Sequence, residues 1–291
     1  MTSAIEDDLL HRAARASGLR ASDARQLWRH ATSVYLLPAE RLVARLTVGD
    51  DAADAARRAV AVTRWLRVQG FPVVEPAAVD QPFFSGDHTV TFWRYYPQDR
   101  PTSVEPWRLG ELLRVLHRLP EPPIELQVYQ PLQRLGATVI SSTSLNADER
   151  QWLLDQRARL LEAYAGLDFP LGVGHIHGDA YPGNLLWHGD DVLLADWDET
   201  AIGPRELDLV NTHHGTRFGR TVQQLDAFDR AYGSSLRTWS GFSVLRAIRD
   251  LHTLGSYIRR ADRGDHTAMA ELRHRLVTLQ QGNITTRWQA R

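Results

Sequence analysis

The sequence predicts an α+β protein with a small N-terminal α+β lobe and a larger, mostly helical C-terminal lobe. Three observations lead to this fold class. Strand-like segments surround one amphipathic helix before about residue 97, and helical periodicity dominates the chain after it. Pro97, Pro101 and Pro106 mark a connector between the two patterns, because proline interrupts both helices and sheets. We therefore expect an N-terminal lobe over residues 1–97 and a C-terminal lobe over residues 98–291.

The small lobe begins with residues 5–30, whose pattern predicts one or two short helices. Residues 52–69 carry apolar side chains at helical spacing after the acidic pair Asp50 and Asp51, so we expect a capped helix there. Apolar runs and alternating patterns predict the strands of the lobe over residues 33–37, 41–48, 73–79 and 89–96.

The large lobe starts with an amphipathic helix over residues 107–119, which has leucines on one face. A Pro-rich, irregular stretch at 120–131 and a weakly patterned region follow, before a helix at 147–165. Two apolar runs, 185–187 and 192–195, flank a polar turn and predict a β-hairpin. The remaining predicted helices lie near 206–214, 221–233, 240–262 and 265–281.

The composition is that of an ordinary globular protein, with 43% apolar residues and a formal net charge of −1. This balance suggests neither nucleic acid nor membrane as a partner. Cysteine is absent, which excludes disulfides, thiol nucleophiles and thiolate metal sites. Lysine is absent too, so a cation that binds phosphate must be arginine. The acidic N-terminal residues lack the order of a signal peptide, and we expect a cytoplasmic protein.

Polar side chains with complementary chemistry surround the predicted hairpin: Asp179, Asn184, Asp196 and Asp198. Pairing of the two apolar runs places Asn184 and Asp196 side by side at the open end of the hairpin. Phosphoryl transfer from a magnesium-bound nucleotide needs one aspartate to orient an attacking hydroxyl. It also needs an asparagine and a second aspartate that hold hard cations through oxygen. The segment therefore predicts a phosphoryl-transfer site.

The spacing from Asp179 to Asn184, and then to Asp196 and Asp198, resembles the aminoglycoside phosphotransferase and choline kinase-like family. The resemblance implies the bilobal protein-kinase-like fold and an enzyme that phosphorylates a hydroxyl group of an antibiotic, a sugar or a related metabolite. It implies that Asp179 orients the substrate hydroxyl. It also implies that Asn184 and Asp196 bind Mg²⁺, while Asp198 binds a second metal ion or lies at the substrate mouth.

The same resemblance implies residues that bind the phosphoryl donor, either ATP or GTP. The segment around Arg45 is similar to the strand that carries the phosphate-binding cation. The segment that leads into the interlobe hinge contains Trp93 and Tyr95, and Ser33 in the preceding turn is a further candidate for binding phosphate. In the family a helix glutamate commonly holds the cation, but Ala59 occupies the inward position here, so the partner of Arg45 stays open.

Two residues are expected to support the loop around Asp179. Asp208 resembles the buried aspartate that follows the metal-binding loop, and we expect it to cap backbone groups beneath the catalytic loop. For His177 we expect packing and hydrogen bonding within the loop.

Two alternatives to a small-molecule kinase stay open. His175, His177 and Asp179 alternate along a strand end and could bind zinc, as in a metallohydrolase. The missing helix glutamate and the lack of a glycine-rich loop also allow a catalytically silent, kinase-like nucleotide-binding protein. The acceptor itself is not specified by the sequence. Because the C-terminal helices are rich in arginine, a neutral or acidic hydroxyl compound is as credible as a polycation.

Overall fold

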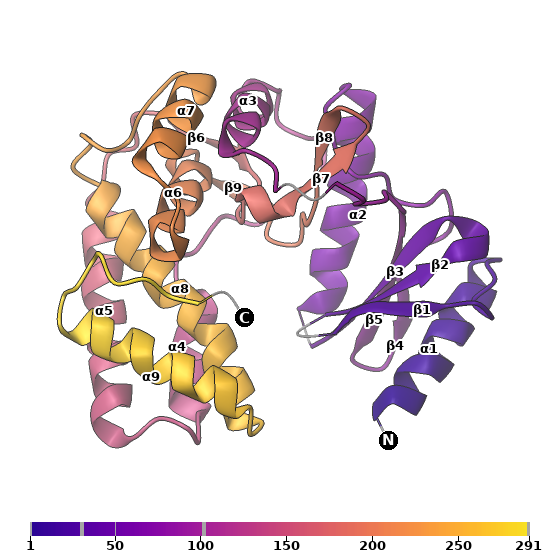
Figure 1. Cartoon of the computed structure of the whole chain (residues 1–291), viewed down its shortest axis with the longest axis horizontal. Coiled ribbons are helices and arrows are strands. Elements are labelled where there is room, and N and C mark those ends of the chain that lie inside the picture. The colour runs from indigo at the N-terminus through magenta and orange to yellow at the C-terminus, as the bar shows by residue number, and fades with distance from the viewer. Residues whose placement is uncertain (1, 30–31, 50, 101–102, 290–291) are drawn as a thin grey trace. The chain divides into compact units, whose positions relative to one another are not determined.

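The computed structural model describes residues 2–29, 32–49, 51–100 and 103–289 (Figure 1). His30, Asp50 and Pro101, which the sequence places in predicted elements or the connector, lie outside these residues. The chain forms two compact units. The first comprises Met1–Val104, Arg118–Gln127 and Pro182–Ala201, and the second comprises Glu105–His117, Val128–Tyr181 and Ile202–Arg291. The predicted lobe boundary between residues 97 and 98 stays a prediction.

The first unit is built on an antiparallel sheet with the strand order β1-β2-β3-β5-β4 (Figure 1). Its strands are β1 (Arg25–Arg29), β2 (Ser33–Leu37), β3 (Leu42–Val48), β4 (Phe83–Ser85) and β5 (His88–Arg94). In β3, Ala44 and Leu46 are buried and alternate with half-buried Val43 and Arg45. This period of two gives the sheet an apolar face and a face that carries Arg45.

Helix α1 (Thr2–Ala16) covers the apolar face of the sheet. Its Leu9 and Leu10 form a common core with Leu46 and Phe92. Helix α2 (Ala52–Val68) begins after Asp51 and contacts β5; Ala56, Ala59, Val60, Val62, Thr63 and Leu66 are buried on it. Burial of apolar surface against the sheet therefore fixes both helices. Each buried CH₂ group contributes about 0.8 kcal/mol to stability.

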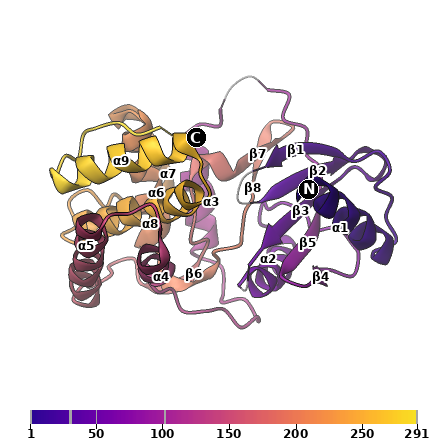
Figure 2. The same cartoon turned by 90° about the horizontal axis from the view of Figure 1, so that it is seen from below.

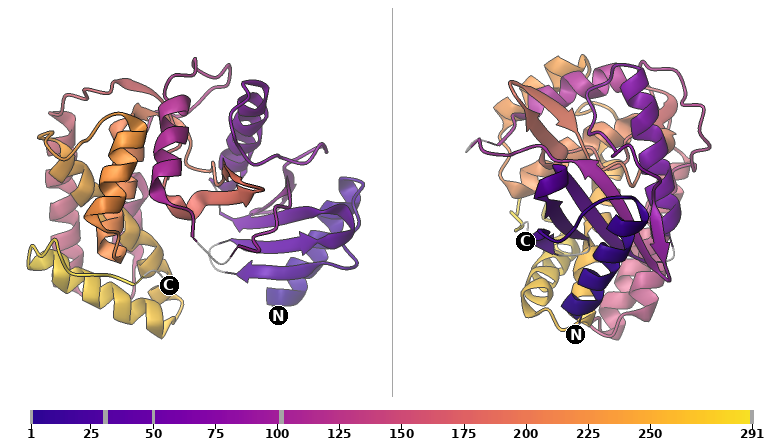
Figure 3. Two further views of the ribbon diagram at one scale, coloured as in Figure 1. Left: turned by 45° about the horizontal axis from the view of Figure 1, so that its top comes forward. Right: turned by 90° about the vertical axis from the view of Figure 1, so that its right-hand side faces the viewer.

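The predicted hairpin belongs to the first unit and consists of β7 (Leu185–His188) and β8 (Asp191–Leu194) (Figure 3). Backbone hydrogen bonds attach it to the segment after α2: the N–H of Leu194 donates to the carbonyl of Pro72, and the N–H of Val74 donates to Leu194. A short 3-10 helix, η2 (Pro182–Asn184), leads directly into β7. The hairpin is thus extended by contacts from a segment more than a hundred residues earlier.

The second unit is mostly helical, and α8 is its central helix because α4, α5, α6 and α9 all contact it (Figures 1 and 2). The helices are α3 (Pro106–Leu116), α4 (Gln133–Ser141), α5 (Ala147–Ala165), α6 (Glu206–His214), α7 (Val222–Tyr232), α8 (Phe242–Asp262) and α9 (His266–Gln280). Two short strands, β6 (Val173–Ile176) and β9 (Ala201–Pro204), pair with each other. No helix in the described ranges is both long and apolar enough to span a membrane.

The predicted fold class is confirmed, but several predicted elements of the first unit are wrong. Residues Arg25–Arg29 form an edge strand and not the end of a helix, because they pair with β2. The segment 73–79 makes only isolated bridges at Val73 and Pro76, since proline has no N–H to donate to a ladder. The sequence also failed to predict β4, α4, β6 and β9.

Candidate active site

The register of the hairpin places the candidate metal ligands. Leu185 lies opposite Leu194, and the N–H of Ala195 donates to the carbonyl of Asn184 over 2.8 Å. Asn184 is therefore aligned with Ala195, and Asp196 follows immediately. Asn184 is buried, whereas the side chain of Asp196 is 43% exposed. The predicted approach of Asn184 and Asp196 at the open end of the hairpin is confirmed.

The backbone of Asp196 is left-handed, with a φ of 65°. Steric conflict makes this conformation unfavourable for residues other than glycine, although aspartate tolerates it better than most. Such residues persist where the surrounding structure imposes them, and they cluster at functional sites. Here the hydrogen bond of the preceding residue, Ala195, to Asn184 fixes the chain before the turn.

Arg45 binds the carboxylates on both sides of Trp197. Its Nη2 donates to Asp196 Oδ1 over 2.9 Å and to Asp198 Oδ2 over 3.0 Å. Burial opposes the charged form of Arg45, but the two carboxylates outweigh it and raise its pKa above the ordinary value. Ala59 on α2 is fully buried. The partners of Arg45 are therefore Asp196 and Asp198, in place of a helix glutamate.

The residue types at this end of the hairpin suit a hard cation. One guanidinium nitrogen contacts both carboxylates, so Asp196 and Asp198 converge on a single position for a positive charge. Together with Asn184 they offer carboxylate and amide oxygens, which are the ligands that Mg²⁺ prefers. Within the described ranges no three His, Asp or Glu side chains form a group that could hold a metal ion. His175, His177 and Asp179 thus form no such group, and the zinc alternative gains no support.

The nucleotide candidates lie on two different faces of the sheet. Trp93 pairs with Val43 next to Arg45, and its Nε1 donates to Thr91 over 2.8 Å. Ser33 pairs with Leu46, so its side chain lies on the apolar face that α1 covers.

The hydroxyl of Ser33 donates to Glu6 of α1 over 3.2 Å. Tyr95 lies just beyond β5, and its N–H donates to the carbonyl of Arg41 over 2.9 Å. Trp93 therefore shares the face of Arg45, and Ser33 does not.

Asp208, at the start of α6, organises the loop that carries Asp179. The N–H groups of His177 and Gly178 donate to its two carboxylate oxygens over 2.8 and 2.9 Å. The Nε2 atom of His117 lies 3.1 Å from Oδ2 of the same carboxylate. Burial raises the pKa of Asp208, but the hydrogen bonds outweigh burial and lower it below the ordinary value. The predicted capping role of Asp208 is confirmed.

Asp179 itself is held from two directions within the second unit. Its N–H donates to Nδ1 of the fully buried His177 over 3.2 Å, which agrees with the predicted role of His177 in the loop. Its Oδ1 accepts a hydrogen bond from Nη2 of Arg249 over 2.5 Å. The sequence did not single out Arg249 as a site residue, since the periodicity of α8 does not say which face meets the loop.

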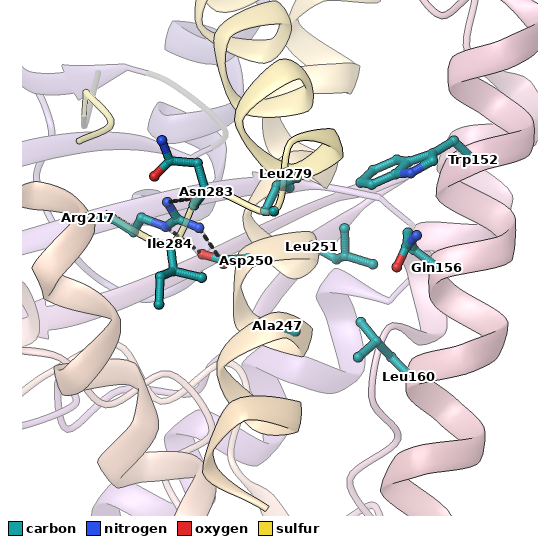
Figure 4. A pocket seen from close by; sticks show the side chains of 11 residues that line it. Trp152, Gln156, Leu160, Arg217, Ala247, Asp250, Leu251, Leu279, Asn283 and Ile284 are labelled. Atoms are coloured by element: carbon teal, nitrogen blue, oxygen red, sulfur yellow. Dashed lines mark hydrogen bonds and ion pairs between the residues drawn. The ribbon is translucent and has the colours of Figure 1, made fainter. Parts of the chain in front are cut away.

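A cavity of about 180 Å³ in the second unit is lined by other residues, mainly from α5, α8 and the segment after α9 (Figure 4). Its charged groups bind each other: Arg217 Nη2 donates to Asp250 Oδ2 over 2.9 Å. Arg217 also donates to the carbonyls of Asn283 and Thr286. This ion pair therefore anchors the C-terminal segment, and none of the candidate site residues lines the cavity.

A small sheet-based unit and a larger helical unit define the protein-kinase-like class of folds. The chain belongs to the phosphotransferase enzyme family, whose model matches residues 22–248. No curated protein sequence matches the chain.

Solved structures of low sequence identity share the fold. An amicoumacin kinase superposes with a TM-score of 0.76 at 14% identity. The alignment covers 98% of this chain and 96% of the kinase chain. A choline/ethanolamine kinase family protein from Mesorhizobium loti gives a TM-score of 0.65 at 16% identity, covering 98% and 97%. A spectinomycin phosphotransferase gives 0.60 at 15% identity, covering 89% and 88%.

Proposed function

We propose that this protein transfers the γ-phosphoryl group of ATP to a hydroxyl group of a small molecule. The observation that carries this proposal is the convergence of Asp196 and Asp198 on one cation position, at the end of the hairpin that also presents Asn184. These three side chains would hold Mg²⁺, which neutralises negative charge on the nucleotide phosphates when bound. ATP is favoured as the donor because the amicoumacin kinase is solved with AMP-PNP and the spectinomycin phosphotransferase with ADP.

Asp179 is assigned to the acceptor hydroxyl. In the transfer, a bond forms between the acceptor oxygen and the γ-phosphorus, the bond from that phosphorus to the bridging oxygen of ADP breaks, and the hydroxyl proton passes to the Asp179 carboxylate. The base need not be strong, because phosphoryl transfer proceeds through a loose transition state that requires mainly positioning. The hydrogen bonds that the backbone N–H groups of His177 and Gly178 donate to the Asp208 carboxylate supply that positioning.

Arg45 is assigned to the nucleotide phosphates. Its guanidinium occupies the cation position between Asp196 and Asp198 in this structure, so Arg45 would leave these contacts for the phosphates when Mg²⁺ binds there, and its raised pKa keeps it charged. A planar guanidinium binds phosphate oxygens as a fork, which suits a chain without lysine. Trp93, on the same face of the sheet, and Tyr95 beyond its end are the remaining candidates for contact with the nucleotide.

The decisive experiment compares the wild-type protein with Asp179→Asn in a screen of hydroxyl-bearing antibiotics, sugars and metabolites for acceptor-dependent ADP formation. We expect turnover by the wild type and a loss of about a hundredfold or more in kcat for Asp179→Asn. Binding of Mg–AMP-PNP should be retained in the variant, because Asp179 is not assigned to the nucleotide. Binding of Mg–AMP-PNP without turnover of any acceptor by the wild type would instead identify the silent, nucleotide-binding alternative.

A further inference from the structure

A basic stripe runs along one face of α8 and begins at the residue that holds Asp179. Arg249, His252, Ser256 and Arg259 follow one another at intervals of three, four and three residues, which places them on one face of the helix. His252, Ser256 and Arg259 are exposed, and Arg249 is half-buried against Asp179. This face of α8 carries no carboxylate between Arg249 and Arg259.

Arg134, on α4, extends the positive charge beyond α8. Helix α4 packs on α8, and Arg134 is exposed. Loss of hydration, followed by the guanidinium charges of Arg249, Arg259 and Arg134, lowers the pKa of His252. The charges that act on His252 most strongly are thus three arginines and one carboxylate, Asp179.

The contact between Arg249 and Asp179 changes what the carboxylate can recognise. Its Oδ1 already accepts a hydrogen bond from Arg249 over 2.5 Å, so Asp179 is not a ready anchor for an ammonium group. A polycation that approached Asp179 would meet three guanidinium groups of the same sign. Like charges across an interface cost affinity, whereas complementary charges steer the correct partner.

Given the proposed function, we propose that the acceptor is a hydroxyl compound that also carries an anionic group, a carboxylate or a phosphate ester. Arg259 and Arg134 bind this anionic group while Asp179 faces the hydroxyl. The protein would therefore prefer acidic acceptors to polycationic ones, and arginines of α4 and α8 would determine this specificity.

The electrostatic part can be tested without a known substrate, because the chain contains no cysteine. Ser256→Cys places a single thiol in the stripe. Its rates of modification by the anionic sulfonatoethyl and the cationic trimethylammonioethyl methanethiosulfonates are compared with those of free cysteine. We expect the anion-to-cation rate ratio to be about tenfold above that of free cysteine. Arg259→Gln should reduce the ratio, whereas Arg230→Gln, at an exposed arginine of α7, should leave it unchanged. A ratio at or below that of free cysteine would overturn the inference.

The substrate part uses acceptors that share a carbon skeleton but differ in charge, such as glucuronate, glucose and glucosamine, within the wider acceptor screen. A higher kcat/KM for acids than for their neutral and amino counterparts would support the proposal of an acidic acceptor. A preference for amines or neutral compounds would overturn that proposal but leave the proposed function intact. If no acceptor is turned over, the proposed function is wrong, and the proposal of an acidic acceptor is wrong as well.

Arg259→Gln separates the acceptor from the nucleotide as the source of the anionic group. We expect the KM of the Arg259→Gln variant for the acidic acceptor to rise about tenfold, because one favourable charge contact is lost. Its KM for ATP should stay unchanged. Arg230→Gln should alter neither constant. A rise in the KM for ATP alone would show that the stripe binds nucleotide phosphates, and the assignment to the acceptor would be wrong.

Discussion

At the scale of single residues, Asp208 illustrates how a buried charge can be retained for positioning. Both of its oxygens accept backbone N–H groups of the loop before Asp179, and His117 contacts one of them. A fully buried carboxylate without such partners would be costly, because desolvation is not repaid. The lowered pKa of Asp208 shows that its partners more than repay burial.

We expect Asp208→Asn to destabilise the folded protein by about 3 kcal/mol, because the new amide group would face N–H donors in place of an acceptor. Urea denaturation followed by circular dichroism measures this change. Asp226→Asn is the matched control, since Asp226 forms an exposed ion pair with Arg237 and such pairs contribute about 0–1 kcal/mol. Equal losses in the two variants would contradict the anchoring role of Asp208.

The sequence predicts the close approach of Asn184 and Asp196 because both flank one hairpin, where register follows from turn length and apolar pattern. It cannot predict the contact of Arg45 with Asp196 and Asp198, which are more than 150 residues further along the chain. The contact of Arg249 with Asp179 also joins distant residues, 70 positions apart. Local patterns specify local neighbours, whereas ion pairs between distant elements depend on how those elements pack.

At the scale of elements, the contact between α3 and α7 requires a glycine at position 110. A Cβ atom at this position would lie 2.6 Å from the carbonyl oxygen of Phe228 and 3.1 Å from the N of Tyr232. Both are backbone atoms of α7, which cannot move aside as a side chain can. The close approach of the two helices therefore depends on Gly110.

Gly110→Ala should destabilise the protein by about 1–3 kcal/mol, the range for overpacking a well-packed interface. Gly255→Ala in α8 is a matched control, because its new Cβ atom would meet only the flexible end of Arg259 at 3.4 Å. There the higher helix propensity of alanine should stabilise by about 0.5–1 kcal/mol. Thermal unfolding of both variants checks the opposite signs, and a stabilising Gly110→Ala would refute the packing argument.

The errors of element prediction share a physical cause. Strand β1 is an edge strand in which Leu27 and Trp28 are largely exposed, so no alternation of buried residues marks it. Helix α4 contains Gly136 and three β-branched residues, which weaken helix propensity, and it is held by packing on α5 and α8. In both cases tertiary contacts determine the element. The bounds of α5 are predicted closely because Asn146 and Glu149 mark its N-terminal cap, and those of α8 because its apolar periodicity is strong.

At the scale of the whole molecule, the order of a small sheet-based unit before a helical one follows from the sequence pattern. The assignment of Pro182–Ala201 to the first unit does not, since it depends on the bridge between Val73 and Leu194. The second unit also buries histidines that a sequence pattern does not distinguish from surface ones: His117, His175, His177, His213 and His214. Buried imidazoles link the stability of the protein to pH.

His175 gives this linkage its sign. Burial lowers the pKa of His175 from 6.5 to about 4, against the opposing charge of Asp208. The unfolded chain therefore binds a proton that the folded protein does not accept until the pH falls to about 4, and stability is lost as pH falls from about 6.5 towards 4. The shift corresponds to at most about 3 kcal/mol. Burial also lowers the pKa of His214, which adds in the same direction.

We expect the free energy of unfolding, measured by urea denaturation between pH 7.5 and 4, to decrease steadily below pH 6.5. His175→Gln should flatten this decrease, because glutamine fills a similar space without a group that titrates in this range. His266→Gln, at an exposed position that begins α9, is the control and should leave the pH profile unchanged. Asp208 acts at lower pH, since its lowered pKa means that its stabilisation is lost only as pH falls below the ordinary carboxylate range. An unchanged profile for His175→Gln would show that His175 is not the source of acid sensitivity.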